Sequence, residues 1–398
     1  PDSDPVYPEP YAFFPAAILR FLESHHGDWL PTVIHCHDYH AGLLPVYLNT
    51  VFGGRIVGQP IRTVFTIHNL AFQGRAPRSA LEHAGLPPEL GDFSPGLSGM
   101  EFYGQINIMK GAICYSDVTT TVSESYAQEI QTPQHGKGLD GILAEAARQG
   151  RLKGIVNGID NDTWNPELLG NGLAYSANDL TGKDRAKGEL RRVFGLAESS
   201  DPIIAVRSRW SYQKGIELVL RALRDYNLHH CAQIAVAGWG KTGNDPTYLR
   251  LWYEMIGWAQ SFPQRIAFKR TPGTDMPATE LHYAGSDMFL MPSLFEPCGL
   301  GQMEAMRYGT IPIVHRTGGL RDTVKDGWGF GFDWSFEEPL DERQKQDGVQ
   351  RLMAALDQAL DTYRDKEAWQ RMMIAAMTQD NDWASRAPQY ERLYRADA

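Results

Sequence analysis

The chain has 398 residues and a formal net charge of −10, a balance that argues against nucleic-acid binding, which normally needs a basic face. Its hydrophobic fraction of 42% and charged fraction of 22% are typical of globular proteins, and its length allows two or three domains. No apolar run approaches the roughly 20 residues of a membrane span, so we expect no membrane partner.

The cysteines and the first residues of the chain are informative about the cellular compartment of the protein. The four cysteines lie far apart without a CxxC pair, which favours a reducing compartment over a disulfide scaffold. The chain begins at Pro1 without a signal-peptide pattern. We therefore expect that the natural N-terminus lies upstream and that targeting is not readable from this segment.

Short β-branched runs alternate with helix-like segments, the pattern of parallel sheets covered by helices. The first strands expected are TVIHC (32–36), RTVFTIH (62–68), VTTTV (118–122) and KGIVNG (153–158). After a polar, loop-like stretch between about 160 and 200 come IIAVRS (203–208), AQIAVAG (232–238), RIAFKR (265–270), MFLMPS (288–293) and TIPIVH (310–315). This order predicts two doubly wound α/β domains facing a cleft, with ligands beyond the carboxyl ends of the strands.

The first strand runs into HCHDYH (35–40), whose imidazole, thiol and carboxylate groups raise the question of a metal site. Strand alternation points His35 and His37 to one side and Cys36 to the other. Asp38 lies one position too early for the H-x-H-x-D-H pattern of metallo-β-lactamase-type hydrolases, and no obvious distant ligands exist, so we expect no metal. Either histidines pack beneath the next helix, or His37 and Asp38 bind a polar ligand.

The second strand ends in TIHNLAFQG (66–74), which places His68 and Asn69 where strand becomes loop, and Gly74 allows a tight chain path there. A lone histidine is more often structural than functional. Because His68 shares a predicted strand-end edge with Asp38, we favour a functional role. VNGID (156–160) adds the amide of Asn157 at the same edge.

In the second half, RSRWSYQKG (207–215) places Arg209 and Lys214 in a loop between a strand and a helix. Two cations at such a position can bind a diphosphate, the arginine as a fork and the lysine as a point charge. A solvated basic turn is the plain alternative. The glycine-rich GWGKTG (238–243) lacks the spacing of a phosphate-binding P-loop and is weak evidence.

Two further strand exits carry polar and glycine-rich turns. SLFEPCGLGQMEAMRYG (293–309) puts Glu296 at a strand exit and Glu304 eight residues later in a helix-like run. RTGGLRDTV (316–324) puts Gly318 and Gly319 before another helix, where backbone N–H groups can approach an anion. Two cations, glycine-rich helix starts and a carboxylate in one domain, facing His, Asp and Asn groups of the other, fit a transferase acting on nucleotide-diphospho-sugars.

These segments, with GIVNGIDNDTWNP, MPSLFEPCGLGQMEAMRYG and RTGGLRDTV in the same order, make the sequence resemble bacterial glycogen synthases and plant starch synthases over nearly its whole length. The resemblance implies the GT-B fold and retaining transfer of glucose from ADP-glucose to the 4-hydroxyl at the non-reducing end of an α-1,4-glucan. It implies no cofactor, and a location in the bacterial cytoplasm or a plastid stroma. We expect an acceptor-side domain of residues 1–162, completed by a helix over 383–398, and a donor-side domain of residues 163–382.

The resemblance also implies roles for individual residues. Those expected at the catalytic centre are His68, Arg209, Lys214 and Glu296. Those expected to bind the donor are Asn157, Cys298, Gly299, Leu300, Glu304, Thr317, Gly318 and Gly319. Those expected on the acceptor side are His37, Asp38 and Asn69, which makes HCHDYH an acceptor-side strand end.

Two departures from the family qualify this interpretation. No segment matches the K-x-G-G-L loop that closes over the donor in the family, so a fragment or a non-catalytic glucan-binding protein is one alternative. Family members often place an aromatic residue against adenine before AGSDMFLMPS, whereas TPGTDMPATELHY (271–283) offers only Tyr283. Use of UDP-glucose, or of a small acceptor by a related GT-B transferase, is therefore the other alternative.

Overall fold

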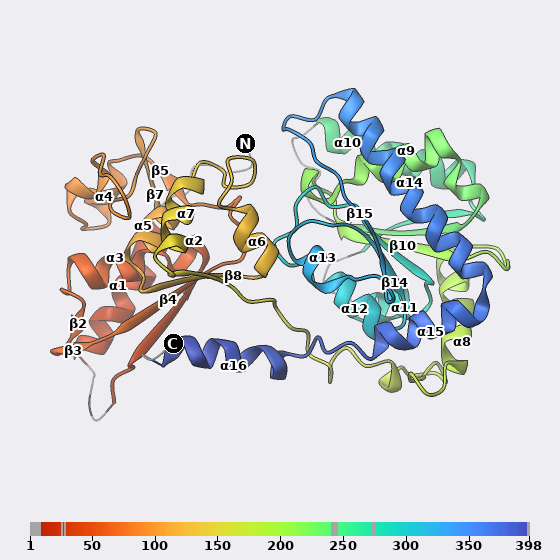
Figure 1. The fold of residues 1–398 in the computed structure, drawn as a ribbon, viewed down its shortest axis with the longest axis horizontal. Helices are drawn as coiled ribbons and strands as arrows, with labels where there is room; N and C mark the ends of the chain where they lie inside the picture. The colour runs from red at the N-terminus through yellow and green to blue at the C-terminus, as the bar shows by residue number, and fades with distance from the viewer. Residues whose placement is uncertain (1–8, 25–26, 28, 240–245, 272–275, 396–398) are drawn as a thin grey trace. The chain divides into compact units, whose positions relative to one another are not determined.

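The computed structural model describes residues 9–24, 27, 29–239, 246–271 and 276–395 (Figure 1). The chain forms two compact units, one of residues 1–156 with 386–398 and one of residues 157–385. The divisions therefore follow Val156 and Ser385, whereas the sequence led us to expect them after residues 162 and 382. Within the described residues, no helix is both long and apolar enough to cross a membrane.

The first unit is built on a four-stranded parallel sheet in the order β1-β4-β8-β9. Its strands are β1 (Val33–His37), β4 (Arg62–Ile67), β8 (Val118–Thr121) and β9 (Leu152–Gly154). The strand expected over 153–158 is wrong in its second half. After Gly154 one more bond follows, from the Ile155 N–H to the Thr121 carbonyl at 2.9 Å, and the chain then leaves the sheet for the second unit.

Helices cover this sheet through a large apolar core. The helices are α1 (Glu9–Ser24), α2 (Asp38–Ala41), α3 (Leu43–Thr50), α4 (Ala80–His83), α5 (Ile108–Tyr115), α6 (Glu124–Glu129), α7 (Asp140–Arg148) and α16 (Trp383–Tyr394). The last of these packs Leu393 against Val118 and Ile155, so the predicted C-terminal helix completes the first unit. We did not predict the short antiparallel strands β2 (Arg55–Ile56), β3 (Gln59–Pro60), β5 (Arg75–Ala76), β6 (Glu101–Phe102) and β7 (Gln105–Asn107).

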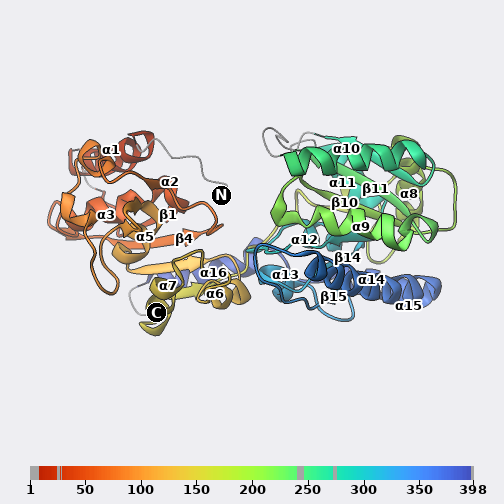
Figure 2. The same cartoon turned by 90° about the horizontal axis from the view of Figure 1, so that it is seen from above.

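The second unit holds a six-stranded parallel sheet in the order β12-β11-β10-β13-β14-β15. The strands are β10 (Ile203–Arg209), β11 (Gln233–Trp239), β12 (Ile266–Arg270), β13 (Met288–Met291), β14 (Ile311–His315) and β15 (Phe330–Phe332). Counted along the unit this is the order 3-2-1-4-5-6 of dinucleotide-binding sheets, and it can be followed from β11 through β10 and β14 to β15 in Figure 2. The three-residue β15, with a glycine at its centre, was too short to predict.

Helices lie on both faces of this sheet, as predicted (Figure 1). One face carries α9 (Ile216–Tyr226), α10 (Pro246–Ser261) and α14 (Glu342–Arg364). The other carries α8 (Thr181–Phe194), α11 (Met276–Ala284), α12 (Gly301–Arg307), α13 (Gly318–Thr323) and α15 (Lys366–Met377). The helix α8 falls within the stretch that we expected to be loop.

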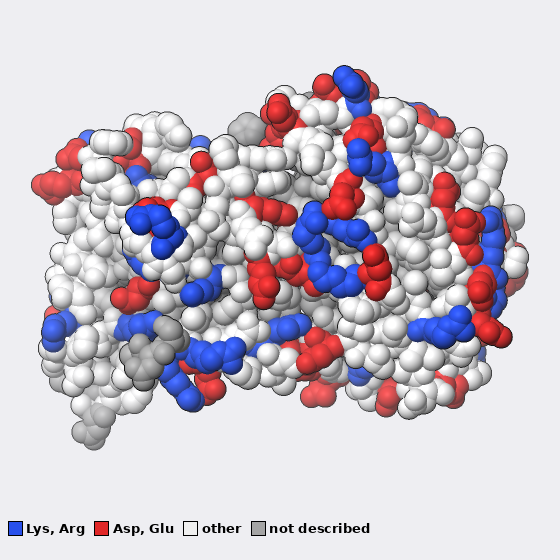
Figure 3. Space-filling model, in the orientation of Figure 1, with Lys and Arg blue, Asp and Glu red and all other residues white. Residues whose placement is uncertain are grey.

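The side chain of Lys183 is one of those that join α8 to the segments before β13 and β14. The buried Lys183 donates hydrogen bonds to the carbonyls of Ala284, Ser286 and Tyr308 and to the Thr310 hydroxyl, at 2.9–3.1 Å. On the outer surface, positive and negative side chains are interspersed on the face shown in Figure 3.

Candidate functional site

The candidate site of the second unit begins where the strand order reverses, between the adjacent strands β10 and β13. The chain leaves β10 into α9 on one face and leaves β13 into α12 on the other, so the two loops diverge at the carboxyl edge of the sheet. Such a reversal point is where doubly wound sheets bind their ligands. The β10 loop carries Arg209 and Lys214, and the β13 loop carries Glu296.

The structure brings two of these three residues into direct contact. The Lys214 Nζ lies 2.5 Å from the Glu296 Oε2, and the Ser293 hydroxyl donates to the same oxygen at 3.0 Å. The side chains of Lys214 and Glu296 are 17% and 6% exposed, so the pair is largely shielded from water. Removing either side chain would leave the other charge buried without a partner, and an unpaired buried charge destabilises the folded protein.

Close backbone packing fixes this pair. Gly215 adopts φ +62°, and a Cβ there would lie 2.0 Å from the Pro292 carbonyl oxygen, so only glycine fits. The Leu294 N–H donates to the Gln213 carbonyl at 2.8 Å and joins the same two loops. Arg209, at the end of β10, is exposed and has no ion-pair partner within the described part of the chain. Its guanidinium is therefore available to a ligand.

A second close approach joins the β13 and β14 loops. The Gly319 N–H donates to the Glu296 carbonyl at 3.1 Å, and a Cβ at Gly319 would lie 2.3 Å from the carbonyl oxygen of Cys298. The side chains of Cys298 and Thr317 are buried, whereas Leu300 is exposed. Gly318 and Gly319 are the first residues of α13, rather than preceding a helix as we expected, because the turn is completed at Thr317.

Glu304 lies in α12 and accepts a hydrogen bond of 2.8 Å from the Tyr283 hydroxyl. Burial raises the pKa of Glu304 to about 6, although the Tyr283 bond and the charge of Arg207 act in the opposite direction. Tyr283 itself is buried, and burial raises its pKa well above the usual value. The aromatic residue noted in the sequence thus holds a carboxylate.

The first unit places its predicted polar residues at one strand edge. The His37 Nδ1 and the His68 Nε2 are 3.0 Å apart, and the backbone N–H of His68 donates to the Asp38 carboxylate at 2.8 Å. Both histidines are exposed. The His37 ring is partly desolvated by its neighbours although the residue is exposed as a whole, and this desolvation and the nearby His68 lower the pKa of His37 against the opposing charge of Asp38, which favours a neutral ring at neutral pH. Asn69 uses its side-chain oxygen to accept from the Ala71 N–H at 3.0 Å.

His35 has a different role from its neighbours. Its ring bonds to the Tyr394 hydroxyl at 2.8 Å and to the Thr66 hydroxyl at 2.6 Å, and burial lowers its pKa to about 4. His35 therefore packs against α16 and β4, while Cys36 points to the opposite, buried side as strand alternation predicts. Among the described residues, no three His, Cys, Asp or Glu side chains are grouped so that they could hold a metal ion.

Some of the residues predicted for the site make no described contact with the others or lie outside the described residues. Asn157 is partly buried in the loop after β9, and no hydrogen bond links it to the other candidates within the described ranges. Residues 240–243 of the GWGKTG turn and residues 272–275 of the 271–283 stretch lie outside the described residues.

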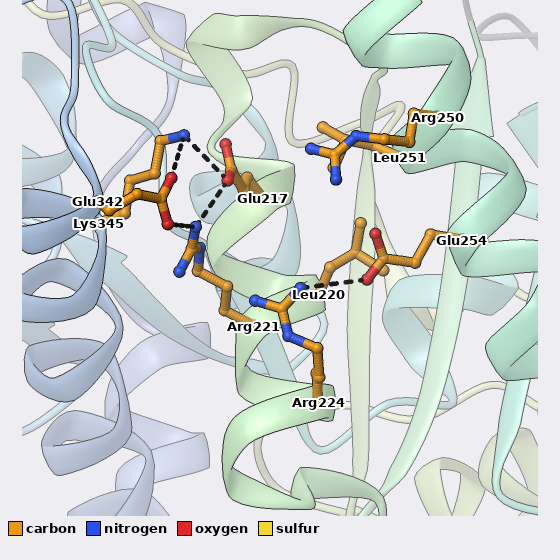
Figure 4. Close-up of a pocket in the computed structure, with 9 residues that line it drawn as sticks. All are labelled: Glu217, Leu220, Arg221, Arg224, Arg250, Leu251, Glu254, Glu342 and Lys345. Carbon is orange, nitrogen blue, oxygen red and sulfur yellow. Dashed lines mark hydrogen bonds and ion pairs between the residues drawn. The ribbon is translucent and has the colours of Figure 1, made fainter.

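Ion pairs that the sequence could not reveal anchor the helix behind Lys214 (Figure 4). Arg221 lies 3.1 Å from Glu217 and 2.6 Å from Glu342, and Lys345 lies 3.2 Å from Glu217. They line a cavity of about 240 Å³ between α9, α10 and α14. Because α9 starts two residues after Lys214, this network helps to hold the Lys214 loop in place.

Two parallel α/β units, one of which carries Arg209 and Lys214 at its reversal point, agree with the GT-B class of glycosyltransferases that the sequence resemblance implies. Residues 4–145 match the family described as "Starch synthase catalytic domain" and residues 189–354 match "Glycosyl transferases group 1". The whole chain is 41% identical to "Glycogen synthase 2" of Geobacter metallireducens and spans 78% of that protein. The chain belongs to the glycogen and starch synthase family.

Other relatives agree with this assignment. A "Glycogen synthase" of Clostridium perfringens is 39% identical over 97% of this chain and 76% of its own length. The solved catalytic domain of starch synthase IV from Arabidopsis thaliana, bound to ADP and acarbose, matches with a TM-score of 0.80 and 33% identity, over 96% of this chain and 76% of that one. A sucrose-phosphate synthase from Thermosynechococcus elongatus, 18% identical with a TM-score of 0.58, shares the fold.

Proposed function

We propose that this protein transfers glucose from ADP-glucose to the 4-hydroxyl at the non-reducing end of an α-1,4-glucan, with retention of configuration. The observation that carries the proposal is the buried Lys214–Glu296 pair at the reversal point of the sheet, with the exposed Arg209 on the same loop. The relative solved with ADP and acarbose supports a nucleoside diphosphate and a glucan-like ligand as the two partners.

The two cations serve the leaving group. As the bond from C1 of glucose to the diphosphate breaks, negative charge grows on the phosphate oxygens, and Arg209 and Lys214 stabilise it. The acceptor O4 bonds to C1 on the same face, and its proton passes to the departing phosphate oxygen. Glu296 holds the hydroxyls of the transferred glucose, with the pocket completed by Asn157, Cys298, Gly299 and Leu300.

The remaining residues orient the two substrates. Glu304 contacts the ribose, and Thr317, Gly318 and Gly319 face the phosphates with their backbone. In the first unit, His68 contacts the glucose or stabilises the charged transition state through its backbone, while His37, Asp38 and Asn69 lie beside the acceptor. The hydrogen bond from the His68 N–H to the Asp38 carboxylate holds these two residues in a fixed position relative to each other.

The experiment is ADP release from ADP-glucose with glycogen present, run beside UDP-glucose. We expect release that requires glycogen and disappears in Glu296→Gln. The matched control is Glu337→Gln, the same change at an exposed carboxylate, which should keep full activity. Binding of glucan without release from either donor would contradict the proposal and favour a non-catalytic glucan-binding protein. The location in a cytoplasm or plastid stroma stays a prediction.

A further inference from the structure

An aromatic ring stands beside the phosphate-binding edge of the second unit. Trp239 is the last residue of β11 and pairs with Arg209 of β10 in the parallel ladder. Neighbouring strands lie about 4.8 Å apart, and residues at matched positions point to the same face of a sheet. The indole of Trp239 is therefore the immediate neighbour of the Arg209 side chain, on the face that carries α8, α11 and α12.

One face of this ring is already covered by a buried cation. The Arg207 guanidinium lies 4.9 Å from the centroid of the Trp239 ring, a cation–π distance, and Arg207 is 8% exposed. Its Nη1 is 3.5 Å from the Thr271 Oγ1, and its charge lowers the pKa of Glu304. Arg207 thus links the ring to the carboxylate that we assign to the ribose, and does not itself project toward solvent.

The position of Trp239 is unlike that of the other nearby indoles. Trp210 is buried on the opposite face of the sheet, where it packs against Trp252 of α10 and Phe268 of β12. Trp239 is partly exposed at the open carboxyl edge instead. Its role in the core is therefore smaller, and a flat aromatic surface is left beside the place where a nucleotide's phosphates would lie.

We propose that the base of the nucleotide donor stacks on the face of Trp239 that Arg207 does not cover. This deepens the proposed function and rests on it. From Arg209 the ligand continues along the same edge, with its ribose at Glu304 and its base on the indole. The buried cation behind the ring fixes the ring plane, so that the stacking surface exists before the donor arrives.

Stacking of the base on Trp239 affects which nucleotide donor the protein prefers. Stacking is tolerant because every base has a π-face, and it grows with the area of the ring system. A site that reads the base mainly by stacking prefers a purine to a pyrimidine by a modest factor. We therefore expect ADP to bind about tenfold more tightly than UDP, and UDP-glucose to remain a slow substrate.

The test is calorimetric binding of ADP, UDP and inorganic pyrophosphate to the full chain. In Trp239→Ala we expect affinity for ADP to fall about tenfold or more, and affinity for pyrophosphate, which has no base, to stay unchanged. Trp239→Phe should retain most of the ADP affinity, since it keeps an aromatic face. Trp29→Ala is the matched control, because Trp29 is 69% exposed in the other unit.

Three other results of the binding measurements would contradict the stacking of the base on Trp239 or the proposed function. Unchanged ADP affinity in Trp239→Ala overturns the stacking proposal. An equal loss for ADP and pyrophosphate also overturns it, because the ring would then be supporting the fold of the edge. Failure of the wild-type protein to bind either ADP or pyrophosphate would instead remove the proposed function itself.

Discussion

Replacing Glu304 by glutamine should change how the stability of the protein depends on pH. Burial moves the pKa of this carboxyl from its ordinary 4.5 to about 6. Between these values the folded state binds more protons at this position than the unfolded state does. Glu304 therefore contributes stability below pH 4.5 and loses it as the pH rises through 6, whereas a glutamine does not titrate.

The magnitude follows from the two pKa values. At pH 7.5 the charged, buried carboxylate costs about 2 kcal/mol of folding free energy, and at pH 5 the cost is about 0.8 kcal/mol. Relative to wild type, Glu304→Gln should thus gain about 1.2 kcal/mol in free energy of unfolding between pH 5 and pH 7.5. Any difference in packing that does not depend on pH cancels from this comparison.

The assay is urea denaturation of wild type and variant at several pH values between 5 and 7.5, followed by circular dichroism. Tyr283→Phe provides a second check, because it removes a hydrogen bond that lowers the Glu304 pKa and should make the pH dependence steeper. A stability difference between wild type and Glu304→Gln that stays constant over this range would refute the reasoning. It would mean that Glu304 titrates as an ordinary exposed carboxyl.

Four further substitutions, one of them with a matched control, test the geometry of the second unit. Arg209→Ala and Lys214→Ala should each lower turnover by about 10²-fold or more, but only Lys214→Ala should also lower the unfolding free energy, by about 3 kcal/mol, because it strands the buried Glu296 partner. Equal stability losses in urea titrations of both would contradict this. Gly319→Ala should lower turnover, because its Cβ would collide with a carbonyl oxygen, while Gly257→Ala, with open space around it in α10, should not. Lys183→Met should lower the thermal midpoint by several degrees, because it removes hydrogen bonds to three buried carbonyls, of which those of Ser286 and Tyr308 keep the Thr310 and Tyr175 hydroxyls as donors, and an unchanged midpoint would show that water replaces the ammonium.

The parallel sheets and the loops of the candidate site were predictable because their signals are local. Buried parallel strands read as β-branched runs, and the Lys214 and Glu296 loops each follow such a run directly. The rule that ligands bind beyond the strand ends then brings these loops to one edge. The contact between Lys214 and Glu296 follows from the adjacency of β10 and β13, and the hydrophobic periodicity of the sequence does not predict the strand order.

Contacts between residues on neighbouring strands were not predictable in the same way, because they depend on how the strands pair. Trp239 and Arg207 lie 32 positions apart in the chain, and only the pairing of β10 with β11 makes them neighbours. The His37–His68 contact depends likewise on the pairing of β1 with β4. The short strands β6 and β15 escaped notice because two or three residues carry too little periodicity to be recognised.

The two ends of the second unit are paired with each other. Ile159 and Asp382 form a parallel bridge, the Ile159 N–H donates to the Asn381 carbonyl at 2.7 Å, and the Trp383 N–H returns to the Ile159 carbonyl at 3.2 Å. A Cβ at Gly158 would lie 2.6 Å from the Trp383 nitrogen, so the pairing requires glycine there. The second unit is thus an insertion whose two ends meet, and a protease that cuts the first connection still leaves this unit covalently joined to the C-terminal segment of the first unit through the other.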